Sequence, residues 1–64
     1  MAQGVLDAKM KTMIALATAT AARSPYLISA HTAALKRLGT DAVELEELMS
    51  VVQVTLGLTP DLET

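Results

Sequence analysis

Apolar residues recur along the chain at the three- and four-residue spacing of helices, interrupted by short polar or glycine-containing stretches. The first such segment begins at Asp7, a good N-cap residue, and runs to about Ala22. One of its faces carries Leu6, Met10, Met13, Ile14, Ala17 and Ala21. The opposite side, with Leu16 and several alanines, is hardly polar either. A helix that is apolar around most of its circumference is expected at the centre of a bundle or at an interface.

A second helix is predicted from Ser24 to Gly39. Serine is a favoured N-cap residue, and Pro25 suits the first helical position, where its missing N–H has no helical partner to lose. Gly39 is the residue type that commonly follows a helix, and Lys36 and Arg37 in the preceding turn complement the negative end of the helix dipole. The apolar face of this helix is expected to contain Leu27, Ile28, His31, Ala34, Leu35 and Leu38.

A third helix is predicted to start at Asp41, which forms a capping-box pattern with Glu44. Its residues form two apolar stripes, one of Leu45, Leu48, Met49 and Val52, and a second of Val43, Val51, Val54 and Leu58. The β-branched run VVQV leaves a strand open as an alternative there, although no partner strand is predicted nearby. The final GLTPDLET, with Gly57 and Pro60, is expected to end the helix and form a tail.

These elements predict an all-α fold, a small bundle of about three helices in one domain over residues 1–64, with tails at 1–6 and 59–64. Because the predicted connections are short, consecutive helices are expected to be antiparallel neighbours.

The composition indicates that the helices need support from other chains. A chain of 64 residues buries only about 60% of the surface that its unfolded form exposes. It has no cysteine, which excludes disulfides, zinc-thiolate sites and iron–sulfur clusters. Its 52% of hydrophobic residues are more than three short helices can readily cover. We therefore expect a homo-oligomer.

Charge and hydropathy argue against several other partners. The net charge is −2, and no basic stripe alternates with aromatic residues, so nucleic-acid binding is not expected. The longest uncharged run, Met13–Ala22, is about half as long as a membrane-spanning helix. No secretory signal pattern is evident, and we expect a cytoplasmic protein. A lone histidine with no neighbouring ligand makes a poor metal site, so neither a metal nor a cofactor is predicted.

The segment KTMIALATATAARSPYLISAHTAALKRLGTDAVELEEL resembles the core of the carboxymuconolactone decarboxylase and alkylhydroperoxidase D superfamily. In that superfamily an alanine-rich helix leads into Cys-x-x-Cys-x-x-x-His, followed by small residues, a glycine turn and an acidic helix start. The similarity covers about residues 9–54, and YLISAHTAALKRLG and DAVELEEL carry it most specifically. It implies an alkylhydroperoxidase D-like helical fold and assembly as a trimer or hexamer.

The resemblance also assigns family positions to individual residues. The two redox cysteines of the peroxidase branch correspond to Ser24 and Leu27, neither of which can act as a redox group. The glutamate of the family's proton relay corresponds to Thr12, which cannot exchange a proton near neutral pH. A polar residue between the cysteines corresponds to Tyr26, a candidate pocket residue. His31 alone of the relay is retained, as a candidate proton carrier.

Three functions follow as alternatives. The first is a degenerate or repurposed alkylhydroperoxidase D-like protein, related to peroxiredoxin-type antioxidant enzymes. Its cysteines were lost by natural divergence, which the leucine at position 27 favours, or by deliberate replacement. The second is a cysteine-independent enzyme of the decarboxylase type, with His31 as proton carrier and Arg23 as a clamp for the substrate carboxylate. The third is a structural oligomerisation module without an active site.

Structural roles compete with these site roles for the same residues. His31 fits a histidine in a helix–helix contact, Ser24 fits an N-cap, and Tyr26 fits an amphipathic residue at an interface. The methionines at 10, 13 and 49 fit core or interface packing.

Overall fold

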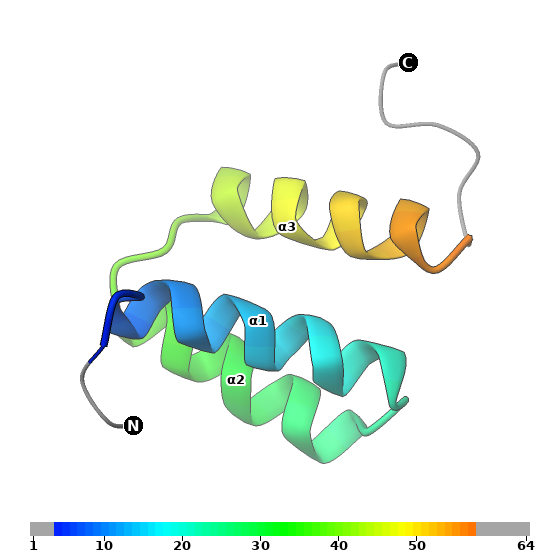
Figure 1. Cartoon of the computed structure of the whole chain (residues 1–64), viewed down its shortest axis with the longest axis horizontal. Coiled ribbons are helices and arrows are strands. Elements are labelled where there is room, and N and C mark those ends of the chain that lie inside the picture. The colour runs from blue at the N-terminus through cyan, green and yellow to red at the C-terminus, as the bar shows by residue number, and fades with distance from the viewer. Residues whose placement is uncertain (1–3, 58–64) are drawn as a thin grey trace.

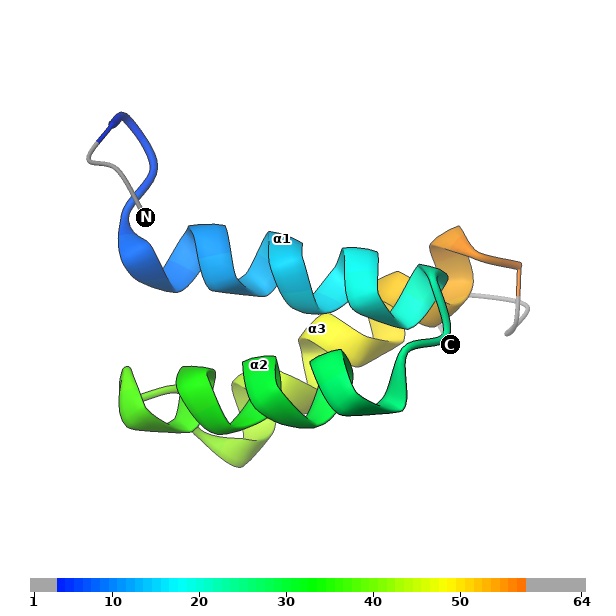
Figure 2. The ribbon, with the colours of Figure 1, turned by 90° about the horizontal axis from the view of Figure 1, so that it is seen from below.

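A computed structural model describes residues 4–57, which form three α-helices joined by two short turns (Figure 1). Helix α1 spans Ala8–Ala21, α2 spans Pro25–Arg37 and α3 spans Ala42–Thr55. The chain runs along α1, returns along α2 and then runs along α3 in the direction of α1 (Figures 1 and 2). This confirms an all-helical architecture. Within residues 4–57 there is no strand, so the strand alternative for VVQV is wrong.

Helix α1 begins where the sequence predicts. The Asp7 carboxylate accepts a hydrogen bond from the backbone N–H of Met10 at 2.8 Å, which satisfies one of the free donors of the first turn. At the other end the N–H of Arg23 donates to Thr20 O at 3.0 Å, and the N–H of Ser24 donates to Ala19 O at 3.1 Å. This is a Schellman motif, and it places Arg23 in the left-handed region with φ of 55°.

The end of α2 has the same motif with the residue type that favours it. The N–H of Gly39 donates to Lys36 O, and the N–H of Thr40 donates to Leu35 O. Gly39 has φ of 88°, which confirms its predicted role as the residue that follows the helix. Thr40 follows in the turn and is buried, and its hydroxyl oxygen has no hydrogen-bond partner among the described residues.

The capping box of α3 is confirmed in both directions. The Asp41 carboxylate accepts from the N–H of Glu44 at 2.8 Å, and the Glu44 carboxylate accepts from the N–H of Asp41 at 3.2 Å. The second oxygen of the Glu44 carboxylate accepts from Lys9 Nζ at 2.7 Å, an ion pair that connects α3 to the start of α1. Gly57, with φ of 78°, follows the helix as predicted. Pro60, Leu58 and the predicted tail at 59–64 lie outside the described residues.

The best-packed contact joins α1 to α2. Leu16 and Ala19 of α1 are buried, and Leu35 of α2 has no exposed surface. Thr12, also buried on α1, donates its hydroxyl hydrogen to Ala8 O at 2.7 Å, so its burial leaves no unpaired donor. The small side chains of α1 allow the two helix axes to approach closely along this contact.

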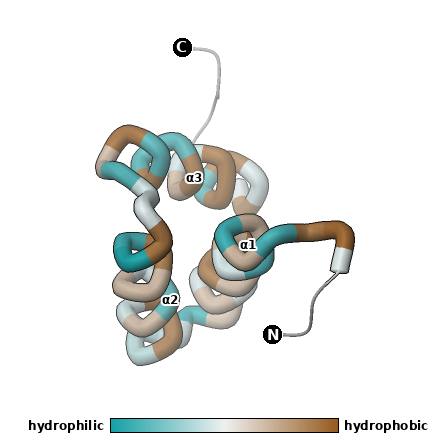
Figure 3. Tube along the Cα trace, turned by 90° about the vertical axis from the view of Figure 1, so that its left-hand side faces the viewer, coloured by the Kyte–Doolittle hydropathy of each residue, from teal (hydrophilic) through white to brown (hydrophobic). Residues whose placement is uncertain are grey.

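Helix α3 packs against α1 and, among the described residues, not against α2. Seen nearly end-on in Figure 3, the three helices lie at the corners of a triangle. Val52 is the buried residue of α3, and Leu45, Leu48 and Met49 of the same predicted stripe are half-buried. Consecutive helices run antiparallel as predicted, but of these pairs α1 and α2 pack together, whereas α2 and α3 do not; α3 packs instead against α1, which runs parallel to it (Figure 1).

The structure shows which of the two apolar sides of α1 is covered. The side with Met10, Ile14 and Ala21 is largely exposed, while the opposite side is buried against α2. Leu6 before the helix is exposed as well. The reason is that Leu16 and the alanines around it form the smoother surface, against which a second helix can lie closely. The bulky methionines and Ile14 face α3 and the solvent beside it instead.

Candidate functional site

The residues that the sequence analysis assigns to the motif lie at the N-cap and in the first two turns of α2. Ser24 is the N-cap residue, but its side chain makes no capping hydrogen bond, contrary to the side-chain cap predicted for it. Its extended backbone and the following Pro25 start the helix without the help of the hydroxyl group. The N–H groups of the first turn of α2 therefore donate no hydrogen bond to the Ser24 side chain.

Ser24, Leu27 and His31 lie on one side of α2, because they are separated by three and four residues. The fully buried Leu35 lies one turn beyond His31 and marks the side that faces α1. Ser24 and His31 are half-buried beside this contact, and Leu27 is 42% exposed at its edge. The motif face is thus the margin of the α1–α2 contact, open to solvent near Leu27.

The imidazole of His31 has no hydrogen-bond partner in the part of the chain that the structure describes. A half-buried imidazole without an orienting acceptor can exchange protons with a bound molecule or with water.

Thr12 lies on the α1 face that packs against α2. It is ten residues from the end of α1 at Ala22, whereas His31 is seven residues from the start of α2, so their levels along the antiparallel helices differ by only about 5 Å at 1.5 Å per residue. Leu27 is about 10 Å from the level of Thr12 by the same geometry. His31 and Thr12, the residues that the resemblance pairs in the proton relay, therefore lie at neighbouring levels of the α1–α2 contact.

Tyr26 and Arg23 do not share this contact. Tyr26 is 80% exposed on α2, and Arg23 is exposed in the turn that precedes the helix. Neither of them lines the groove between α1 and α3 that is described below. Both remain candidates only for a site that another chain or a substrate would complete.

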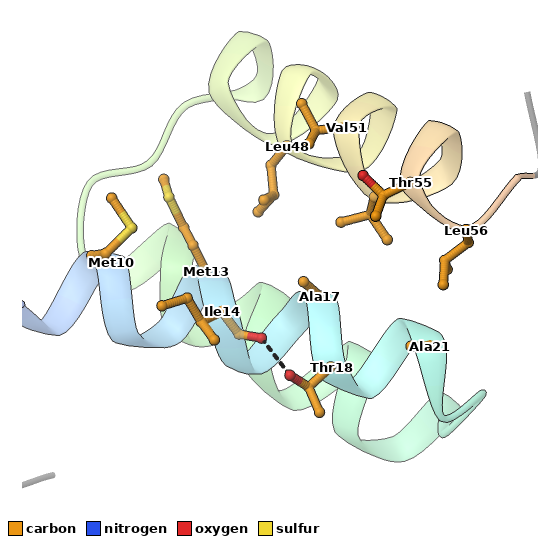
Figure 4. A pocket seen from close by; sticks show the side chains of 11 residues that line it. Met10, Met13, Ile14, Ala17, Thr18, Ala21, Leu48, Val51, Thr55 and Leu56 are labelled. Carbon is orange, nitrogen blue, oxygen red and sulfur yellow. Dashed lines mark hydrogen bonds between the residues drawn. The ribbon is translucent and has the colours of Figure 1, made fainter. Parts of the chain in front are cut away.

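One concavity among the described residues was not predicted from the sequence. A groove of about 470 Å³ lies between α1 and α3 and is lined almost entirely by apolar side chains (Figure 4). Its lining residues are Met10, Met13, Ile14, Ala17, Thr18 and Ala21 from α1, and Leu48, Val51, Val52, Thr55 and Leu56 from α3 and its C-cap. The second apolar face of α1 was the sequence signal that could have indicated this groove. The groove itself exists only because α3 lies beside that face.

The groove contains no group suited to acid–base or covalent chemistry. Its polar side chains are Thr18 and Thr55, and the Thr18 hydroxyl donates to Ile14 O at 2.9 Å (Figure 4). His31 does not line it. The groove and the motif face are therefore separate surfaces, one suited to apolar contact and the other carrying the imidazole.

Ion binding and charge are limited in the described part of the chain. Within residues 4–57 no cluster of three or more histidine or acidic side chains could hold a metal ion. The pKa of the Glu44 carboxyl is lowered, first by its hydrogen bond from Lys9 and then by the backbone N–H of Asp41. This carboxylate is committed to the start of α3. None of the described helices is long and apolar enough to cross a membrane.

Comparison with known proteins gives a match to a protein family. The model of the carboxymuconolactone decarboxylase family matches residues 1–60, which is nearly the whole chain. Searches of curated proteins and of solved structures returned no significant match.

Proposed function

Because the chain belongs to the carboxymuconolactone decarboxylase family, we propose that it is an alkylhydroperoxidase D-like member without thiol peroxidase activity, repurposed as a homo-oligomeric protein. The observation that carries this proposal is the absence of cysteine from the whole sequence, with Ser24 and Leu27 at the positions of the redox pair. Peroxide reduction by this family's route needs a thiolate to attack the O–O bond and a second thiol to form the disulfide. A serine hydroxyl and a leucine side chain supply neither.

Oligomer formation is supported by the exposed apolar side chains. Half of the side-chain surface of Ile14 and 45% of that of Met10 are exposed in the groove, and Leu38 and Val43 are exposed on α2 and α3. Contiguous apolar surface of this kind marks interaction sites in soluble proteins. A trimer or hexamer, the assembly that the family resemblance implies, would cover part of it.

The first test is peroxide consumption in the presence of a thiol reductant. We expect the wild-type chain to consume no more peroxide than the blank. Consumption that increases with protein concentration would contradict the proposal, because it would require a redox group that the sequence lacks.

The second test restores the missing pair. The double variant Ser24→Cys, Leu27→Cys places two thiols in the first turn of α2, where the helix N-terminus favours a thiolate. We expect it to form an intramolecular disulfide and to react faster with a thiol reagent than Ser29→Cys, Thr32→Cys, which has the same spacing in the middle of α2. Equal reactivity of the two pairs would argue against a redox-motif geometry at Ser24.

A second candidate function is favoured by the unpartnered imidazole of His31. A cysteine-independent decarboxylase-type enzyme needs a group that delivers a proton to the carbon from which carbon dioxide departs, and His31 is available for that step. Arg23 would hold the substrate carboxylate. Turnover of a lactone acid by the wild type that is lost in His31→Ala, but retained in Thr32→Ala, would favour the enzyme over the inert oligomer.

A further inference from the structure

The groove face of α1 has a gradient of side-chain size. Met10, Ile14, Ala17 and Ala21 follow one another at spacings of four, three and four residues, which is the spacing of a helix–helix seam. The N-terminal pair is bulky and the C-terminal pair is small. All four line the groove, and Met10, Ile14 and Ala21 are exposed (Figure 4).

This order is complementary to itself when reversed. When two such helices pack antiparallel, a residue from the N-terminal half of one helix lies opposite a residue from the C-terminal half of the other, and each opposed pair forms one layer of the contact. Met10 of one copy then lies against Ala21 of the other, and Ile14 lies against Ala17. Each layer has one large and one small side chain, the combination that packs without voids or overlap.

We propose that the groove is the interface with a second copy of this chain, in which the two α1 helices pack antiparallel about a two-fold axis through the Met10, Ile14, Ala17 and Ala21 seam. This interface would join the copies of the homo-oligomer in the proposed function, so the proposal rests on that function. Leu48, Val51 and Leu56 of α3, which form the other wall of the groove, flank the α1 helix of the second copy. The centre of the dimer becomes a bundle of four helices.

Charge at the ends of α1 favours the same arrangement. Asp7 is exposed one turn before Met10, and Arg23 is exposed two residues after Ala21. The antiparallel pairing brings Asp7 of each copy toward Arg23 of the other at both ends of the seam. A parallel pairing would instead oppose like charges and place Met10 against Met10, so the antiparallel arrangement is favoured by charge and by packing.

The two-fold axis restricts the assembly. An isologous interface joins copies in pairs, so it fits a dimer or a hexamer built from dimers, and it does not fit a cyclic trimer. The molar mass in solution therefore tests the symmetry, and a purely trimeric species would overturn this interface while leaving the homo-oligomer in place.

Disulfide cross-linking tests the register. The chain has no native cysteine, so every cross-link comes from the introduced thiols. Ile14→Cys chains mixed with Ala17→Cys chains should give mainly the mixed disulfide dimer, identified by its mass, because residue 14 faces residue 17 of the other copy. Ser29→Cys mixed with Ala33→Cys, two exposed positions on the outer side of α2, is the control. No excess of the mixed dimer over this control and over the two homodimers would overturn the register.

A size exchange tests the packing. Ala17→Ile places a bulky residue against Ile14 of the other copy, and we expect it to raise the dimer dissociation constant at least about tenfold. Adding Ile14→Ala restores one large and one small residue in the layer, and the double variant should return to within about threefold of wild type. If the double variant is as weak as, or weaker than, the single variant, the pairing is wrong.

Circular dichroism of each variant at low concentration checks that the chain is still folded. If Ala17→Ile loses its helical signal, Ala21→Met with and without Met10→Ala provides the same test in the outer layer. A wild-type chain that is still monomeric by light scattering at a concentration of about 100 μM overturns both the homo-oligomer and this interface. Association without mixed cross-linking overturns the interface alone.

Discussion

The left-handed backbone conformation of Arg23 predicts that a glycine at this position stabilises the fold. Arg23 takes the Schellman position after α1 with φ of 55°, where Gly39 takes the equivalent position after α2 with φ of 88°. A residue with a Cβ atom in this region costs about 1–2 kcal/mol. Glycine removes that cost but adds about 0.5–1 kcal/mol of backbone entropy to the unfolded chain. Arg23→Gly should therefore stabilise the fold by about 0.5–1 kcal/mol.

The reciprocal substitution gives the matched control. A Cβ added at Gly39 meets no atom within 4 Å, so Gly39→Ala changes the backbone preference without a clash. It should destabilise the fold by the same amount, about 0.5–1 kcal/mol. Arg23→Lys keeps both the charge and the Cβ atom and should change the stability by less than about 0.5 kcal/mol.

The measurement is urea unfolding followed by circular dichroism at one protein concentration for all variants, with thermal midpoints as a second readout. A change of 1 kcal/mol moves the midpoint of a domain of this size by about 4–8 °C. The reasoning fails if Arg23→Lys stabilises as much as Arg23→Gly, because the side chain and not the backbone would then be responsible. It also fails if Arg23→Gly lowers the midpoint.

Three further predictions concern single contacts. Leu35→Ala, which empties the fully buried position of α2, should cost about 2–5 kcal/mol in urea unfolding, whereas Ala33→Gly on the outer side should cost about 1 kcal/mol from helix propensity alone. Thr40→Val should leave the stability unchanged or raise it by about 1 kcal/mol, because the buried hydroxyl has no partner, and a loss above that size would reveal one. Since the folded pKa of Glu44 lies below its ordinary value of 4.5, its stabilising contribution is complete above that pH and is lost as the pH falls through the folded pKa. Unfolding titrations should show Glu44→Gln to be less pH-dependent than wild type over this acidic range, and identical pH profiles would contradict the role of the Lys9 pair.

Helix ends could be predicted from the sequence because they depend on neighbouring residues. Asp7 and Asp41 cap α1 and α3, and Gly39 follows α2, through bonds that span three to five residues. Arg23 was missed as a left-handed residue because its type does not favour that conformation. There the rest of the turn, with two Schellman hydrogen bonds, overrides the preference of the residue.

The arrangement of the faces could not be predicted, since α1 is apolar on both sides. Leu16 and Ile14 are both apolar, so the sequence does not show which of them α2 covers, and the closeness of the α1–α2 packing decides it. That Ser24, Leu27 and His31 share one side of α2 could be predicted from their spacing of three and four residues along the helix. Their relation to Thr12 depends on the pairing of α1 with α2, and the groove depends on that of α1 with α3.

The attachment of α3 to α1 alone has a consequence for the dynamics of the chain. The α1–α2 hairpin contains Leu16 and Leu35, the two most deeply buried large side chains, while α3 contributes Val52 and the ion pair of Glu44 with Lys9. A unit with so few buried contacts can open while the hairpin stays folded. In native-state hydrogen exchange the amides of α3 should therefore exchange at a lower opening free energy than those of α1 and α2. Helix α3 would then be the first cooperative unit to unfold. Its amides should gain protection from hydrogen exchange when a second chain covers it.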